Sequence, residues 1–201
     1  MESTQFITDV MLDAWINEAY EELWDLVASA FADHFWTTSD FTLTSTEAGA
    51  KFTLPATFRQ LRFVERNPGT SSRVRIPRWA IAEKNRLPSL SYRLVGTVLE
   101  VDPYEDAAGP YRIYYVDNPT SLVLATDTVD ARVDTWREFI VILASIKART
   151  KEESDTADLR ADLDRVRKRI EEASQHRDAS DPGRVSDVWD GDPLWPPPWR
   201  V

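Results

Sequence analysis

The chain has 201 residues, of which 42% are hydrophobic and 11% aromatic, enough to bury the core of one ordinary domain with an appendage. Its formal net charge of -10 excludes the basic surface that phosphate neutralisation requires, so we expect no sequence-specific binding of nucleic acid. The absence of cysteine excludes disulfides, thiolate metal sites and a cysteine nucleophile. It does not indicate in which cellular compartment the protein resides.

An amphipathic helix is predicted over residues 9–33. Thr8 or Asp9 is suited to cap its start, and at about 1.5 Å per residue the helix is long enough to cross a small domain. The preceding segment, Met1–Gln5, carries an acid where a secretory signal has basic residues, so we expect no such signal. The apolar positions step by three and four along the chain: Leu12, Trp15, Ile16, Ala19, Leu23, Leu26, Val27, Ala30 and Phe31.

The middle of the chain, residues 36–126, is predicted to be a β-rich insertion. Runs of β-branched and aromatic residues, several of them alternating, predict short strands. Breakers such as Asn67-Pro68-Gly69 and Asn118-Pro119 separate these runs, which favours an antiparallel, hairpin-connected sheet. A short helix is expected from about Pro77 to Asn85. The predicted strands lie at residues 41–44, 51–54, 62–64, 91–95 and 111–116.

Two more helices are predicted, over residues 135–150 and 156–176. Thr135 and Glu138 have the spacing of a capping box at the start of the first, which is expected to pair with the N-terminal helix. The longest apolar run of the chain, residues 139–146, lies in this helix and is far shorter than the roughly 20 residues that span a bilayer. We therefore expect no contact with a membrane.

A narrow apolar seam marks the last helix. Leu159, Leu163, Val166, Ile170 and Ala173 step by four, three, four and three residues, and charged side chains fill most positions between them. Two interpretations stay open. The seam packs on the chain's own domain, as amphipathic helices usually do, or it docks on a neighbouring subunit or partner.

The segment 177–201 is predicted to be an extended tail that docks on a partner. Pro196-Pro197-Pro198 favours a stiff polyproline conformation, and burial of one tryptophan contributes about 4–6 kcal/mol before costs. A disordered tail, or one that folds back on its own sheet, is the alternative. The candidate anchors are Trp189, Leu194, Trp195, Pro197 and Trp199.

No residue pattern points to catalysis, a cofactor or a metal. His34 and His176 lack the paired spacing of metal ligands, and the six glycines form no phosphate-binding loop or nucleophile elbow. Carboxylate pairs such as Glu21-Glu22 are interpreted as a solvated face, because the whole chain is acidic. The loop 102–106 has oxygen ligands but not the glycine and terminal glutamate of an EF-hand, so we interpret it as an exposed turn.

Three segments carry a family resemblance. The first is Leu12–Leu23, with Ile-Asn-Glu-Ala at its centre, and the second is Phe52–Phe58, with a Leu-Pro turn. The third runs from Trp136 through Lys-Glu-Glu-Ser-Asp at 151–155 to Arg-Ile-Glu at 169–171 and Arg-Asp at 177–178. In this order they resemble the head-to-tail adaptor (connector) proteins of tailed bacteriophages. The resemblance covers nearly all of the first 188 residues, whereas the extension from Trp189 to Val201 departs from it.

The resemblance implies a structural, non-enzymatic subunit of the virion neck that assembles in the host cytoplasm. Its expected partners are the portal protein, a tail, nozzle or fibre-bearing neck protein, and further copies in a ring of about twelve, with DNA as passing cargo. The last helix and tail would reach the portal, and an acidic channel would let DNA slide. A tail-completion or terminator protein is the nearest alternative. Two less favoured alternatives are a small carboxylate-dependent enzyme and a ligand-binding β domain.

The expected fold is therefore α+β. It consists of a bundle of two long antiparallel helices plus a charged C-terminal helix, with an inserted antiparallel β-rich region and an extended C-terminal tail. In domain terms we expect an adaptor domain at residues 1–176 and a docking tail at 177–201.

Overall fold

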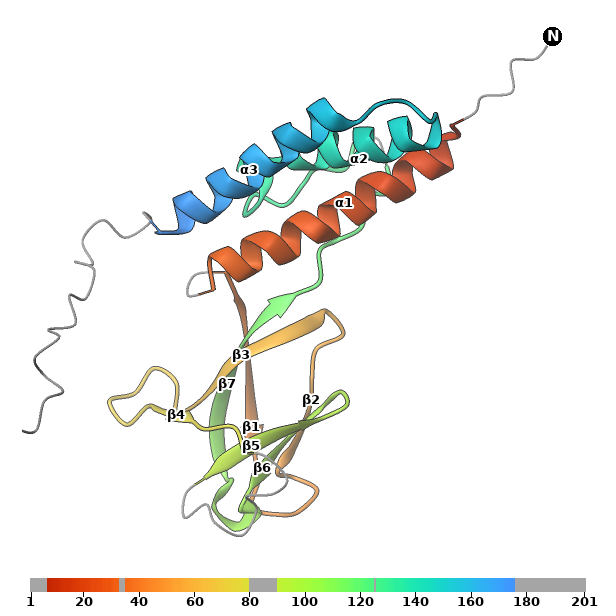
Figure 1. The fold of residues 1–201 in the computed structure, drawn as a ribbon. Helices are drawn as coiled ribbons and strands as arrows, with labels where there is room; N and C mark the ends of the chain where they lie inside the picture. The colour runs from red at the N-terminus through yellow and green to blue at the C-terminus, as the bar shows by residue number, and fades with distance from the viewer. Residues whose placement is uncertain (1–6, 33–34, 80–89, 125, 176–201) are drawn as a thin grey trace, which may run out of the picture.

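The computed structural model describes residues 7–32, 35–79, 90–124 and 126–175, which form a layer of helices at one end and a β region at the other (Figure 1). The helices are α1 (Asp9–Ala30), α2 (Glu138–Lys151) and α3 (Ala157–Gln175), with short 3-10 turns η2 (Tyr104–Asp106) and η3 (Asp134–Trp136). The strands are β1 (Thr37–Leu43), β2 (Lys51–Thr53), β3 (Phe58–Arg66), β4 (Val74–Ile76), β5 (Ser91–Val95), β6 (Val98–Asp102) and β7 (Gly109–Asp117).

The β region contains two sheets, with strand orders β1-β7-β3-β4 and β2-β6-β5, and all strand pairs are antiparallel. Strand β7 lies between β1 and β3, so its residues Tyr111 and Ile113 are fully buried. Their neighbours in the core include Val64 of β3 and Leu99 of β6, which come from different sheets. The two sheets therefore share one apolar core, separate from that of the helices.

The three helices pack as one layer around a second core, which contains Leu23 and Trp24 of α1, Phe139 of α2 and Ile170 of α3. Ion pairs at the surface join neighbouring helices. Helix α2 runs antiparallel to α1 (Figure 1), and Lys147 of α2 pairs with Glu18 of α1. Arg169 and Glu138 likewise join the end of α3 to the start of α2, which makes α2 antiparallel to α3 as well.

The expected bundle of two long antiparallel helices is wrong, although the α+β class holds. Within the described residues, three helices stand beside seven strands, and the helix predicted over 135–150 is the shortest of the three. Its first residues instead form the 3-10 turn η3, and α2 begins after Arg137 without a side-chain cap, so the predicted capping box at Thr135 is also wrong. The α3 helix packs on both α1 and α2, which completes the layer.

The prediction of one hairpin-connected sheet also needs correction. Only the β3–β4 and β5–β6 pairs join consecutive strands, whereas β7 pairs with β1 and β3, which lie far earlier in the chain. The strands β4 and β6 were not predicted. Residues 77–79, expected to start a helix, are extended and bridge to Tyr92, and residues 80–85 of that predicted helix lie outside the described residues.

The first helix begins as its sequence suggests and ends earlier than expected. The Thr8 hydroxyl accepts a hydrogen bond from the backbone N–H of Met11, which caps the helix. At the other end, Arg62 of β3 donates to the backbone carbonyl of Ala28. The last turn of α1 has no basic residue of its own, so this arginine supplies the positive charge that a helix C-terminus favours. None of the helices among the described residues is long and apolar enough to cross a membrane.

Candidate assembly surfaces

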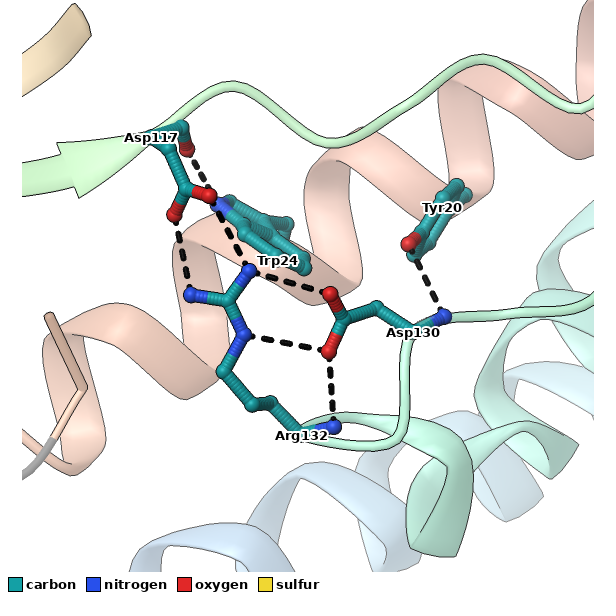
Figure 2. Close-up of polar contacts among 5 residues, drawn as sticks. All are labelled: Tyr20, Trp24, Asp117, Asp130 and Arg132. Atoms are coloured by element: carbon teal, nitrogen blue, oxygen red, sulfur yellow. Dashed lines mark hydrogen bonds and ion pairs between the residues drawn. The ribbon is translucent and has the colours of Figure 1, made fainter. Parts of the chain in front are cut away.

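The contact between the helical layer and the β region is built around Arg132, in the segment between β7 and α2 (Figure 2). Its guanidinium donates to both carboxylate oxygens of Asp117, at 2.9 and 3.1 Å, and to both of Asp130, at 3.0 Å each. Asp117 is the last residue of β7, so one side chain ties the end of a central strand to the segment leading into α2. Bidentate pairs of this kind hold a defined geometry as well as adding attraction.

Aromatic side chains complete this junction from the helical side. The Arg132 guanidinium lies 4.5 Å from the ring centre of Trp24, and the Trp24 indole N–H donates to the backbone carbonyl of Asp117 at 2.8 Å. The hydroxyl of Tyr20 accepts from the backbone N–H of Asp130, and burial raises the pKa of this hydroxyl. We refer to Tyr20, Trp24, Asp117, Asp130 and Arg132 as the polar junction. It joins α1, β7 and the start of the α2 segment at one point.

The polar junction changes the pKa of the Asp130 carboxyl group. Hydrogen bonding to Arg132 lowers its pKa from the ordinary value of 3.8, against the opposing effect of burial. The ionised form is therefore favoured in the folded chain, and the junction depends on a charge that acid removes.

The seam predicted on the last helix lies inside the helical layer. Leu163, Val166 and Ile170 are buried in the core with residues of α1 and α2, and Leu159 is partly buried against it. The charged positions beside the seam also serve contacts within the chain, because Arg167 pairs with Glu22 of α1. In this structure the seam is used for intramolecular packing. Docking of these residues on a partner would require α3 to leave the layer.

The tail residues predicted to dock on a partner, namely Trp189, Leu194, Trp195, Pro197 and Trp199, lie outside the described residues, as do His34 and His176. Among the residues that the structure does describe, no group of three or more histidines and carboxylates could hold a metal ion. Glu22, one of the carboxylates considered for acid–base chemistry, is engaged by Arg167 at the surface.

An exposed apolar loop lies beside α1 and was not predicted from the sequence. Val123 and Leu124 are 78% and 66% exposed, yet their backbone is held firmly. The Asp127 carboxylate accepts hydrogen bonds from both of their N–H groups, and these bonds lower its pKa. The side-chain amide of Asn17 exchanges two hydrogen bonds with the backbone of Leu122. An ordered loop thus presents two apolar side chains to solvent.

An apolar groove opens between this loop and α2. It has a volume of about 500 Å³, and Val141 at its rim is 65% exposed. The loop and the groove together form what we call the loop–α2 surface. The groove is lined by Ile16 of α1, Leu122 and Val129 of the loop, and Arg137, Glu138, Ile140, Val141 and Ile142 of α2.

The sequence carried only weak signals for these features. Val123 and Leu124 belong to the short apolar run Leu122–Leu124, which has no helical or strand periodicity, so no pattern marked them as exposed. Arg132 lies among alternating acidic and basic residues, where a charge usually indicates a solvated position. The one usable signal is Asp127, since an aspartate a few residues after a short apolar run can accept hydrogen bonds from the backbone of that run and order a turn.

A protein-family model matches most of this chain. The family model described as "SU10 adaptor protein" matches residues 1–186, which covers all the described residues. Curated proteins gave no match to this sequence.

The burial of the α3 seam predicts the effect of a charge within it. Leu163→Asp should lower the free energy of unfolding by about 3–5 kcal/mol, because it removes a buried side chain and places an unpaired carboxylate in the core. Urea denaturation followed by circular dichroism measures this change. Arg165→Ala, on the exposed face of the same helix, should change stability by no more than about 0.5 kcal/mol. An equally stable Leu163→Asp variant would show that the seam is not packed within the chain.

The lowered pKa of Asp130 predicts a pH dependence. The stabilisation from its ionised form is fully present above the ordinary value of 3.8 and is lost as the pH falls through the lowered value of the folded chain. Unfolding free energies measured from pH 7 down to pH 3 should therefore fall more steeply for the native sequence than for Asp130→Asn, which has no proton to take up. Parallel pH profiles for the two proteins would contradict the role assigned to this carboxylate.

Proposed function

Since the chain belongs to the SU10 adaptor protein family, a family of phage head-to-tail adaptors, we propose that it forms a ring, of about twelve copies, below the portal of a tailed phage. The observation that carries this proposal is the family match over residues 1–186. The ring extends the channel through which DNA leaves the capsid and provides the surface to which the tail attaches. The copies assemble in the host cytoplasm and become part of the virion neck.

The division of the chain into two cores supports contact with two partners. The helical layer and the β region each have their own apolar core, and the polar junction fixes one on the other. An adaptor needs two separate faces held at a constant distance, and this architecture supplies them (Figure 1). We assign the helical end, where α3 leads into the tail, to the portal, and the β region to the next neck or tail component.

The tail carries the portal contact in this proposal. Leu163, Val166 and Ile170 are engaged within the helical layer of the free chain, so they are not offered on its surface. The tail contributes Trp189, Leu194, Trp195, Pro197 and Trp199, which together combine large apolar anchors with a stiff spacer. Aromatic anchors of this type often dominate the free energy of an interface.

The acidic composition suits a channel for DNA. A net charge of -10 per copy repels the phosphate backbone, so a ring of such copies would let the duplex slide rather than bind it. We assign no catalytic role or cofactor to the chain, and DNA is its passing cargo.

Portal binding is the direct test of this function. The purified chain is mixed with portal rings and analysed by size-exclusion chromatography with light scattering, alongside Trp195→Ser/Trp199→Ser. The native sequence should co-elute with the portal at a mass that fits a ring. The double variant should bind at least tenfold more weakly, since each buried anchor is worth about 2 kcal/mol or more.

The control is Val95→Ser, at an exposed position in the β region, which should bind the portal like the native sequence. Absence of portal binding by the native sequence would overturn the proposal. Binding to tail tubes instead of portal rings would identify a tail-completion or terminator protein.

A further inference from the structure

The loop–α2 surface leaves several apolar side chains of the described residues uncovered. Val123, Leu124 and Val141 are each more than half exposed, and the groove beside them is lined mainly by aliphatic side chains. Its volume of about 500 Å³ falls within the range of roughly 300–1,000 Å³ typical of pockets that take an organic group. Because the loop is held by Asn17 and Asp127, this surface exists before any ligand arrives.

The chain itself has a segment of matching chemistry, which follows α3. Arg169 of α3 pairs with Glu138, and Glu138 is one of the residues that line the groove. Helix α3 ends at Gln175, six residues or about 9 Å further along its axis. The C-terminal segment, residues 176–201, therefore begins less than two helical turns beyond an ion pair with a residue that lines the groove.

The length of this segment is sufficient for its tryptophans to reach the groove. Trp189 follows Gln175 by 14 residues, and a flexible chain of that length has a root-mean-square span of about 20 Å and a limit near 46 Å. A ligand attached through so short a linker has an effective concentration in the millimolar range, which favours the chain's own segment over that of another copy.

The composition and charge of the C-terminal segment match those of the groove. The segment offers Val188, Trp189, Leu194, Trp195 and Trp199, whose burial needs an apolar surface. Arg137 is exposed at the edge of the groove and forms no ion pair with any carboxylate in the part of the chain that the structure describes. The acidic residues Asp187, Asp190 and Asp192 flank Trp189 and would supply the opposite charge.

We infer that the loop–α2 surface binds the tryptophan- and proline-rich C-terminal segment of its own chain in the free protein. The aromatic side chains cover the groove and the exposed pair Val123 and Leu124, and the flanking aspartates face Arg137. This contact keeps the tryptophans from solvent until a partner takes them. It concerns the free chain and holds or fails independently of portal binding.

Site-specific photo-crosslinking of the full-length chain tests this contact. A benzoylphenylalanine is introduced at Val141, and the crosslinked peptides are identified by mass spectrometry. The matched control carries the same group at Val95, which is also exposed but lies in the β region. Mixing isotopically light and heavy protein separates crosslinks within one chain from those between copies.

The expected result is a crosslink from position 141 to peptides within residues 185–200 of the same chain, and none from position 95. Adding Leu124→Asp should reduce the yield at least fivefold, because it places a charge on the proposed binding surface, whereas Val74→Asp, exposed on β4, should leave it unchanged. No crosslink to these peptides would overturn the inference. Crosslinks only between light and heavy copies would also overturn it and would assign the surface to a second copy.

Discussion

The arrangement of this chain depends on one guanidinium placed between two carboxylates. Arg132 joins the end of β7 to the segment that leads into α2, and it lies against Trp24 of α1. Val116 of β7 is buried in the helical core, so the two parts also meet through an apolar contact, and the polar junction adds bonds of defined direction beside it. Arg59 and Arg62 of β3 add contacts to the last turns of α1. The polar junction therefore lies where the helical layer and the β region are joined.

This constraint gives the family assignment a physical meaning. In the proposed role the chain contacts one component above and one below, and two faces that do not move relative to each other would suit that role. Asn17, from the Ile-Asn-Glu-Ala stretch that carried the resemblance, holds the loop before Arg132 in place through Leu122. One part of the family pattern thus has a structural role in this chain, since it orders the connection between the two parts.

Local patterns in the sequence allowed the helices and most strands to be predicted, but not their assembly. The three-and-four spacing in α1 and α3 indicates that one face of each helix is buried. It does not indicate which surface covers that face. In this structure Ile170 of α3 packs within the chain. The pairing of β7 with β1 joins residues about 70 positions apart, such as Asp40 and Arg112, and no local signal specifies it. The 3-10 turn before α2 replaced the expected cap. Arg132 and Val123 escaped prediction because their roles arise only from tertiary contacts.

The fixed position of the helical layer on the β region is most directly measured as a distance between the two parts. The chain has no cysteine, so spin labels can be placed by Arg165→Cys on α3 and Val95→Cys on β5 without background. Double electron–electron resonance should give a single narrow distance distribution for this labelled pair. Adding Arg132→Ala should broaden that distribution while circular dichroism shows both parts still folded. Distributions of equal width with and without Arg132 would contradict the account.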